Sequence, residues 1–124
     1  MLWKKRYTEL QVWQKAMSLT KNIYQITGSF PHEERVGLTS QLRRAAVSVP
    51  SNIAEGYARA STKDYIHFLS IARGSIAELE TQLYISKDLE YVQEESLENV
   101  FVLIEEISKM LTAMIVKLKQ KTMG

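Results

Sequence analysis

The segment that decides the fold is residues 38–59, LTSQLRRAAVSVPSNIAEGYAR. Its apolar side chains recur every three or four residues, which is the period of a helix and not of a strand. Pro50 interrupts this pattern, because a proline inside a helix removes one hydrogen bond and collides with the carbonyl of Ala46, at a cost of about 3 kcal/mol. The stripe nevertheless keeps its phase from Leu42 through Ile53. We therefore predict a helix over about 31–59, opened by Pro31 and kinked near Pro50.

Three further segments with the same period flank this one, at about residues 9–27, 62–91 and 94–121. Thr8 is a candidate cap for the first, and Gly28 is expected to close it in the left-handed conformation. Ser61 and Asp64 form a capping box at the start of the third. The linkers are short, so successive helices should pack antiparallel. The prediction is an all-α, up-down-up-down four-helix bundle formed by residues 1–124 as a single domain.

Two details of the outer segments carry structural expectations. Val100, Leu103 and Met110 widen the apolar surface of the fourth segment beyond one seam, which indicates burial against two neighbours or against another subunit. Gly74 lies inside the third segment and costs about 1 kcal/mol relative to alanine there. Such a glycine favours close packing of a neighbouring helix over a chemical role.

Composition excludes several classes of protein. The 124 residues are 45% hydrophobic and contain five glycines, two prolines and no cysteine. This excludes disulfide frameworks, thiolate metal sites and cysteine nucleophiles, and it disfavours the many turns of a β sandwich. No apolar signal region follows the basic N-terminus, and Glu105, Glu106 and Lys109 interrupt the most hydrophobic stretch. We expect a cytoplasmic protein with no membrane association.

Motifs of enzymes are absent from the sequence. It contains no glycine-rich phosphate loop and no Gly-x-Ser-x-Gly elbow. Asp64 and His67 lie three residues apart on one helical face, which is half of a carboxylate–histidine metal motif. A di-metal bundle needs a second copy of that motif, and none is present. We expect no catalytic activity, no metal and no cofactor.

Charge is distributed unevenly, although the net charge is only +2. Residues 1–63 hold ten Lys/Arg and four Asp/Glu, whereas residues 64–124 hold six and ten. These halves can pair within the bundle, pair between subunits, or present a basic face to a polyanion. The second helix also carries a polar ridge that is either a solvated face, an interhelical hydrogen-bond network or a contact surface. The ridge consists of Gln41, Arg44, Ser48, Asn52, Glu55 and Arg59.

Several stretches of the chain resemble a known family. They are LQVWQKA at 10–16, FP at 30–31, GLTSQLRRAAVSVPSNIAEG at 37–56, DYIHFL at 64–69, ARGS at 72–75 and ELETQL at 78–83. Together they closely resemble the "four helix bundle protein" family, whose members are encoded by intervening sequences within bacterial 23S ribosomal RNA genes. A related branch is the accessory protein of diversity-generating retroelements. The resemblance implies a ring-like homopentamer and, for the retroelement branch, binding of nucleic acid and of a reverse transcriptase.

Our leading functional hypothesis is a non-enzymatic, oligomeric scaffold that binds RNA or DNA through basic side chains. The alternative is a protein–protein adaptor ring with no direct contact to nucleic acid. An N-terminal arm of Lys4, Lys5 and Arg6 is an auxiliary candidate for contact. The candidate nucleic-acid-binding residues are Arg43, Arg44, Arg59, Lys63 and Arg73.

Overall fold

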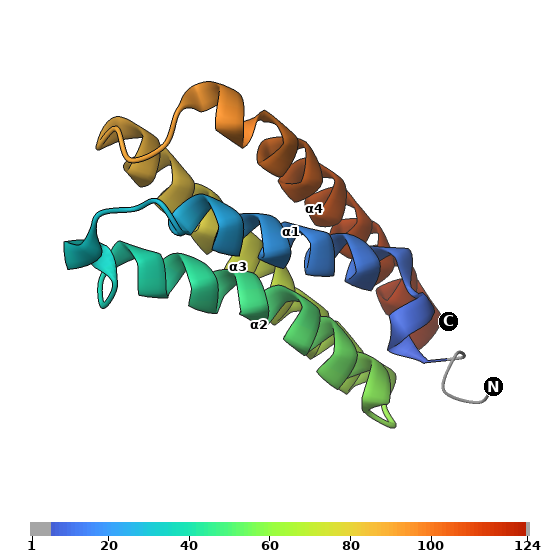
Figure 1. Cartoon of the computed structure of the whole chain (residues 1–124). Coiled ribbons are helices and arrows are strands. Elements are labelled where there is room, and N and C mark those ends of the chain that lie inside the picture. Colours follow the sequence, from blue (N-terminus) through green and yellow to red (C-terminus); the bar gives the residue numbers. More distant parts are fainter. Residues whose placement is uncertain (1–5, 124) are drawn as a thin grey trace.

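The computed structural model describes residues 6–123, and within this range it contains helices and no strand (Figure 1). The four long helices confirm the predicted all-α bundle. The elements in chain order are η2 (Tyr7–Glu9), α1 (Gln11–Thr27), η3 (His32–Glu34), α2 (Leu38–Ala58), α3 (Thr62–Asp88) and α4 (Glu94–Met123), where η marks a 3₁₀ turn.

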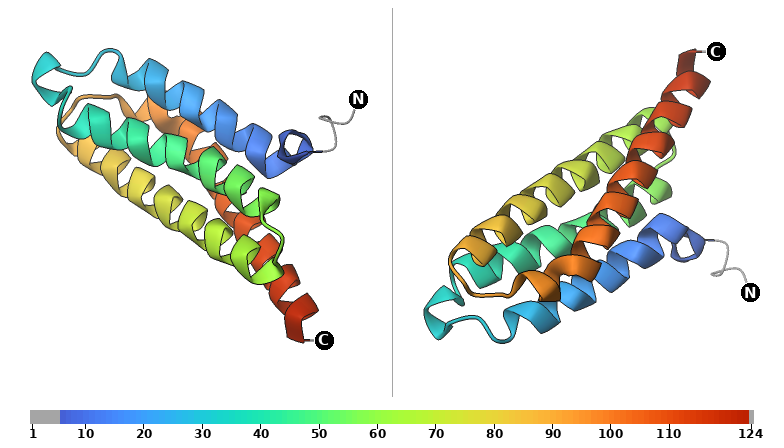
Figure 2. Two further views of the ribbon diagram at one scale, coloured as in Figure 1. Left: turned by 90° about the horizontal axis from the view of Figure 1, so that it is seen from below. Right: turned by 90° about the horizontal axis from the view of Figure 1, so that it is seen from above.

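Each long helix packs against two others, in the cyclic order α1, α2, α3, α4 and back to α1. Consecutive helices run antiparallel, with the connections α1–α2 and α3–α4 at one end of the bundle and α2–α3 at the other (Figures 1 and 2). The last turns of α4 extend beyond the α2–α3 connection (Figure 2). The up-down-up-down arrangement is thus as predicted.

Two helix boundaries around α2 and α3 differ from the sequence prediction. Helix α2 begins at Leu38 and not near residue 31, because Pro31 is extended at ψ 142° and is followed by the separate turn η3. Gly37, at φ −111° and ψ −114°, separates η3 from α2. Helix α3 ends at Asp88 and not near residue 91, because Glu90 adopts the left-handed conformation at φ 64°. Helix α2 continues through Pro50, as predicted, and the kink there stays a prediction.

The end caps of α1 also differ from the prediction. Helix α1 starts at Gln11 without a side-chain cap, and Thr8 contributes instead its backbone carbonyl, which accepts a hydrogen bond from Gln14 Nε2 at 2.9 Å. Gly28 is right-handed at φ −60° and not left-handed. In contrast, Asp64 N donates to Ser61 Oγ at 3.0 Å, which confirms the cap of α3.

The core receives fully buried aliphatic side chains from all four long helices. Each such side chain contributes roughly 1.5–3 kcal/mol on burial. The wide apolar surface of α4 is used within the chain, since Val100 is buried and both Leu103 and Met110 pack against the core. The largest fully buried side chains include Leu19, Ile23, Leu42, Ile53, Leu69, Leu79, Leu83, Leu97, Ile107 and Leu111.

Polar side chains fix the register between α2 and α3. The hydroxyls of Ser48 and Ser75 share a hydrogen bond at 2.8 Å, and Gln82 Nε2 donates to Gln41 Oε1 at 3.4 Å. Moving from Gln41 to Ser48 along α2 covers the same number of residues as moving back from Gln82 to Ser75 along α3. One antiparallel register therefore satisfies both pairs.

Close approach at the far end of the same interface requires a glycine. A Cβ atom on Gly56 would lie 2.9 Å from Phe68 Cβ and 3.0 Å from Tyr65 Cδ1. The expectation of close packing at Gly74 is wrong, because a Cβ there would meet nothing within 4 Å.

Glu34 caps the start of α2 from outside the helix. Its Oε1 accepts a hydrogen bond from Leu38 N at 3.0 Å, and its Oε2 accepts one from Tyr91 Oη at 2.9 Å. These bonds, chiefly the one from Leu38, hold the pKa of the Glu34 carboxyl below its ordinary value, and the same carboxylate raises the pKa of Tyr91. Glu34 therefore ties the α1–α2 connection to the α3–α4 connection.

The two glycines make a matched pair for alanine substitution. Gly56→Ala should destabilise the protein by about 1–3 kcal/mol through overpacking, whereas Gly74→Ala should stabilise it by about 0.5–1 kcal/mol through helix propensity. Urea unfolding measures both changes. Equal effects of the two substitutions would contradict the close approach at Gly56.

The Glu34 carboxylate should make stability depend on pH. Because the pKa of Glu34 is lowered in the folded state, the contribution of its carboxylate to stability is complete above the unfolded-state pKa of about 4.5. That contribution is lost as pH falls through the folded-state pKa. Glu34→Gln should therefore lower Tm at pH 7 and have a shrinking effect as the solution is acidified. The control is Glu33→Gln, which changes an exposed residue in the same turn. It should leave Tm unchanged both at pH 7 and in the acidified solution.

Candidate nucleic-acid interface

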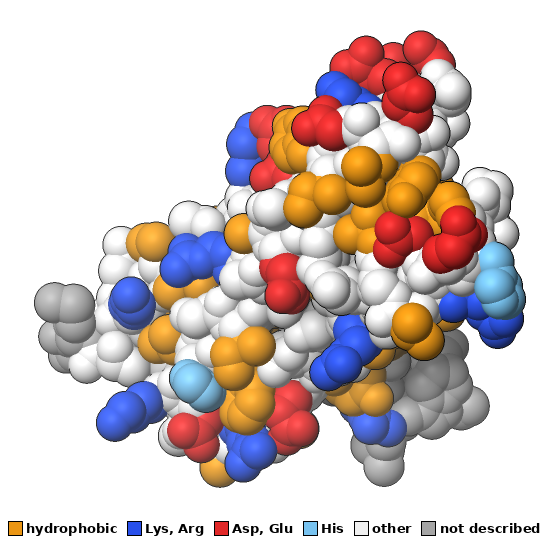
Figure 3. All heavy atoms as spheres, turned by 90° about the vertical axis from the view of Figure 1, so that its left-hand side faces the viewer, with side chains coloured by type: hydrophobic (Ala, Val, Ile, Leu, Met, Phe, Trp, Pro, Cys, Tyr) orange, Lys and Arg blue, Asp and Glu red, His pale blue; other side chains and the backbone are white. Residues whose placement is uncertain are grey.

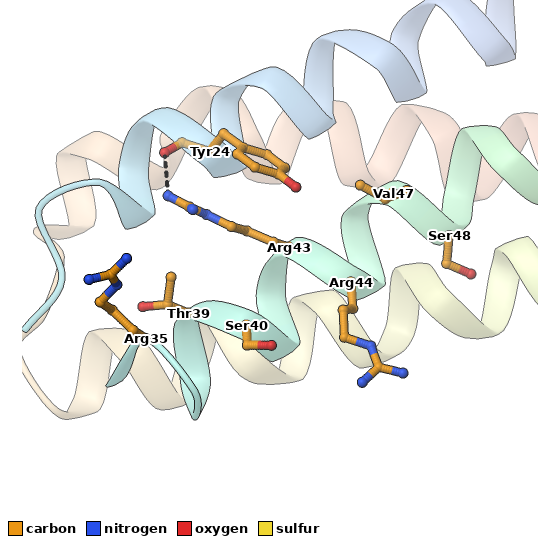
Figure 4. A pocket seen from close by; sticks show the side chains of 8 residues that line it. All are labelled: Tyr24, Arg35, Thr39, Ser40, Arg43, Arg44, Val47 and Ser48. Atoms are coloured by element: carbon orange, nitrogen blue, oxygen red, sulfur yellow. Dashed lines mark hydrogen bonds between the residues drawn. The ribbon is translucent and has the colours of Figure 1, made fainter. Parts of the chain in front are cut away.

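A groove of about 620 Å³ runs along the start of α2 beside α1 (Figure 4). Three arginines and no carboxylate line it, together with hydroxyl-bearing and apolar side chains. Its walls come from α1, from the connection before α2, and from the first three turns of α2. The lining residues are Tyr24, Arg35, Thr39, Ser40, Arg43, Arg44, Val47 and Ser48.

Arg43 is anchored to the C-terminal end of α1. Its Nε donates to Thr27 Oγ1 at 2.9 Å and one terminal nitrogen donates to the Tyr24 carbonyl at 3.4 Å. The guanidinium also lies 4.5 Å from the centroid of the Tyr24 ring. A cation at this position suits the negative end of the α1 dipole. Arg43 therefore has a structural role, and its remaining N–H groups are held at the groove.

Arg44 and Arg35 are exposed and approach the groove from different directions. Figure 4 shows the Arg44 side chain directed away from Arg43, as adjacent helical positions require, while Arg35 and Arg43 flank Thr39. Within residues 6–123, none of the three arginines forms an ion pair with a carboxylate. The positive charge of this groove is therefore not neutralised by an ion pair in the part of the chain that the structure describes.

Thr39 forms part of the groove floor and is only 6% exposed. Its hydroxyl has no hydrogen-bond partner in the described structure. Figure 4 shows this oxygen pointing toward the Arg35 side of the groove. A buried hydroxyl without a partner costs free energy, so it needs a physical explanation.

The five predicted binding residues lie in three separate places. Arg43 and Arg44 line the groove described above. Arg59 and Lys63 are exposed beside the α2–α3 connection, roughly 20 Å away along α2. Arg73 belongs to α3, and its side chain reaches α4, where it donates to Thr112 Oγ1 at 3.4 Å. The structure therefore does not bring the five together into one patch.

Arg59 is also partly engaged within the chain. It pairs with Glu55 at 3.1 Å and lies 4.9 Å from the centroid of the Phe68 ring. In the proposed N-terminal arm, Lys4 and Lys5 lie outside the described residues, and Arg6 is exposed with its guanidinium 5.1 Å from the centroid of the Tyr7 ring.

Sequence reasoning missed Arg35, Thr39 and Tyr24. Arg35 lies in the connection before α2, which the sequence prediction placed inside a continuous helix. Its spacing of four from Thr39 and of eight from Arg43 was the available signal, since such positions share one helical face. The contribution of Tyr24 from α1 depends on tertiary packing.

Acidic side chains gather at the same end of the bundle but over the other hairpin. Figure 3 shows them at the top of the view, over the connection between α3 and α4. This acidic tip is made of exposed side chains, namely Asp88, Glu90, Glu94, Glu95 and Glu98. At this end of the bundle the α3–α4 hairpin therefore has an excess of negative charge, whereas the α1–α2 hairpin combines the three groove arginines with Glu33 and Glu34.

Neither metal chemistry nor a membrane span is indicated by the described part of the chain. No group of three or more His, Asp or Glu side chains within residues 6–123 is arranged to hold a metal ion. None of the helices there is long and apolar enough to cross a bilayer. His67 is exposed.

The fold and the groove define a small antiparallel helical-bundle protein with a cationic surface groove. The family model of the 23S rRNA-intervening sequence protein matches residues 8–113, and the chain belongs to this family. A crystal structure from Bacteroides thetaiotaomicron VPI-5482, described as a protein of unknown function from the S23 ribosomal protein family, has the same fold. It is 26% identical, with a TM-score of 0.75 over 84% of this chain and 97% of that chain. Among curated proteins, none matches the sequence.

The anchoring of Arg43 can be tested against its neighbour. Arg43→Lys keeps the charge but loses the geometry of the bonds to Thr27 and Tyr24, so it should destabilise the protein by about 1–3 kcal/mol. Arg44→Lys should change stability by no more than about 0.5 kcal/mol. Chemical denaturation distinguishes them, and equal stabilities would show that the Arg43 bonds contribute nothing.

Proposed function

We propose that this protein is a non-enzymatic, oligomeric scaffold that binds nucleic acid through the basic groove beside α2. The observation that carries this proposal is a groove lined by three arginines, without a carboxylate and without a neutralising ion pair in the described structure. Arginine is suited to phosphate because its planar guanidinium offers two parallel N–H donors.

Binding of this kind depends on charge more than on base sequence. Each arginine that neutralises a phosphate releases a condensed counterion, so affinity should fall steeply as salt rises. A few contacts on one chain give weak binding, whereas a symmetric assembly multiplies them. For this reason we propose an oligomer as the functional unit, and the family resemblance implies that this oligomer is a homopentamer.

The family name refers to intervening sequences of 23S rRNA and names no binding partner, so the proposal of nucleic-acid binding rests on the groove. Neither the family description nor the related crystal structure indicates catalytic activity. We propose a binding role, and we propose that it is exercised in the cytoplasm.

A protein–protein adaptor is the second candidate. Ile85 in the last turn of α3 and Leu89, the residue that follows the helix, are 44% and 51% exposed, and Val102 on α4 is 56% exposed. Tyr84 on α3 stacks on Phe101 of α4 with ring centroids 5.1 Å apart. These apolar side chains are available to a protein partner or to another subunit.

Light scattering with and without a short structured RNA tests the leading proposal. We expect the mass of a pentamer, which increases with RNA at low salt and not at high salt. Arg44→Glu should weaken RNA binding about tenfold or more and reduce its salt dependence, because Arg44 is exposed and has no carboxylate partner.

Lys119→Glu on α4 is the matched control, since it changes net charge equally at an exposed position away from the groove, and Lys119, like Arg44, pairs with no carboxylate in the described structure. It should leave RNA affinity nearly unchanged. A pentamer that binds no RNA at any salt concentration would contradict nucleic-acid binding and favour the protein–protein adaptor. A monomer would contradict the oligomeric part of it.

A further inference from the structure

We propose that Arg35, Thr39 and Arg43 form a defined phosphate-binding subsite on the floor of the groove. This inference deepens the proposed function by assigning the atoms that hold one phosphate group. The three residues line the groove and also the adjoining depression between the end of α1 and the start of α2. They therefore lie at the boundary between the groove and this depression.

Thr39 supplies the observation that points to a ligand. Its side chain is more than nine-tenths buried, and its hydroxyl has no hydrogen-bond partner in the described structure. A phosphate oxygen would accept the hydrogen bond that this hydroxyl lacks. An empty, purely structural position would be better occupied by valine, which has the same shape and no polar atom.

The two arginines supply charge from opposite sides of Thr39. Arg43 is held rigidly by Thr27 and by the Tyr24 carbonyl, so it loses little freedom when it binds an anion. Arg35 is exposed and lies in the connection before α2. Neither pairs with a carboxylate in the described structure, so an anion between them would remove their mutual repulsion.

The geometry favours a phosphate over a carboxylate. Donors from Arg35, Thr39 and Arg43 approach from different directions, which matches the tetrahedral arrangement of phosphate oxygens better than the planar arrangement of a carboxylate. The start of α2 does not provide this site, because Glu34 already accepts the hydrogen bond from Leu38 N.

The rest of the groove has room for more than a phosphate. Its volume of about 620 Å³ lies within the usual range for small-molecule sites. Tyr24 and Val47, which are 44% and 40% exposed, form an apolar wall that suits a sugar or a base. A nucleic-acid backbone and a free nucleotide both supply such a phosphate, and the two sources share the same subsite.

Access to the Thr39 hydroxyl requires a small movement, because this oxygen is covered in the unliganded arrangement. Arg35 flanks the hydroxyl in Figure 4 and has the long, exposed side chain that can swing onto the ligand. Binding would then order Arg35 while the backbone stays in place.

The test is a titration of the full chain with inorganic phosphate and with a nucleoside 5′-monophosphate, at constant ionic strength in chloride. Backbone amide chemical shifts and Tm are followed. Phosphate should shift the amides of residues 35–43 and raise Tm. Thr39→Val should weaken phosphate binding about tenfold while raising the Tm of the free protein. Arg35→Gln should weaken binding at least as much.

Two controls separate the subsite from general charge effects. Thr81→Val removes an exposed hydroxyl on α3, and Lys117→Gln removes an exposed cation near the C-terminal end of α4. Both should bind phosphate like the unmodified protein. Unchanged phosphate affinity in Thr39→Val, or no response of the unmodified protein beyond that of chloride, would overturn the subsite.

The same variants separate this inference from the proposed function. RNA binding that survives in Thr39→Val and Arg35→Gln would overturn the subsite and leave nucleic-acid binding intact. Phosphate binding at the subsite without RNA binding would support the subsite and contradict the proposed function. Binding of the monophosphate as tight as that of an oligonucleotide would identify a free nucleotide as the source of the phosphate.

Discussion

The packing of α2 against α3 is the contact on which the rest of this structure depends. Ser48 and Ser75 share a hydrogen bond in the middle of this interface, and Gly56 admits Phe68 at its far end. Because each residue turns a helix by 100°, these contacts fix how α2 is rotated about its own axis. That rotation directs Arg43 toward α1 and leaves Arg44 exposed. The position of the groove is therefore a consequence of small and polar residues in the α2–α3 interface.

The polar ridge of α2 shows how one helical face serves several purposes. Gln41 and Ser48 bond to α3, and Asn52 donates to Ser48, so this part of the ridge is an interhelical network. Glu55 pairs with Arg59 at the surface, where such pairs contribute little to stability. Arg44 is left as the exposed cation. The ridge is thus an interhelical hydrogen-bond network in one part and a solvated face in another, and the contact surface stays a prediction for Arg44.

Sequence periodicity was sufficient for the fold because the core positions follow it in all four helices, and the Ser61 cap was recognisable from local chemistry. It was insufficient wherever a distant residue decides the outcome. Helix α2 begins late because Glu34, bonded to Tyr91 from another hairpin, caps Leu38 from outside the helix. For the same reason the site was only half predicted: Arg43 and Arg44 were identified, whereas Arg35 depends on where α2 starts.

The charge pattern at the loop end of the bundle allows two arrangements that exclude each other. The arginine groove lies on the α1–α2 side, and the acidic tip lies on the α3–α4 side. If the groove of one subunit met the acidic tip of the next, Arg44 would be paired in the assembly and closed to phosphate. If the groove stays open, the acidic tip repels a polyanion and directs it along α2, over a range of about 10 Å at moderate salt. The buried Thr39 hydroxyl favours the open arrangement, because a neighbouring carboxylate at the surface satisfies Arg44 without reaching the groove floor.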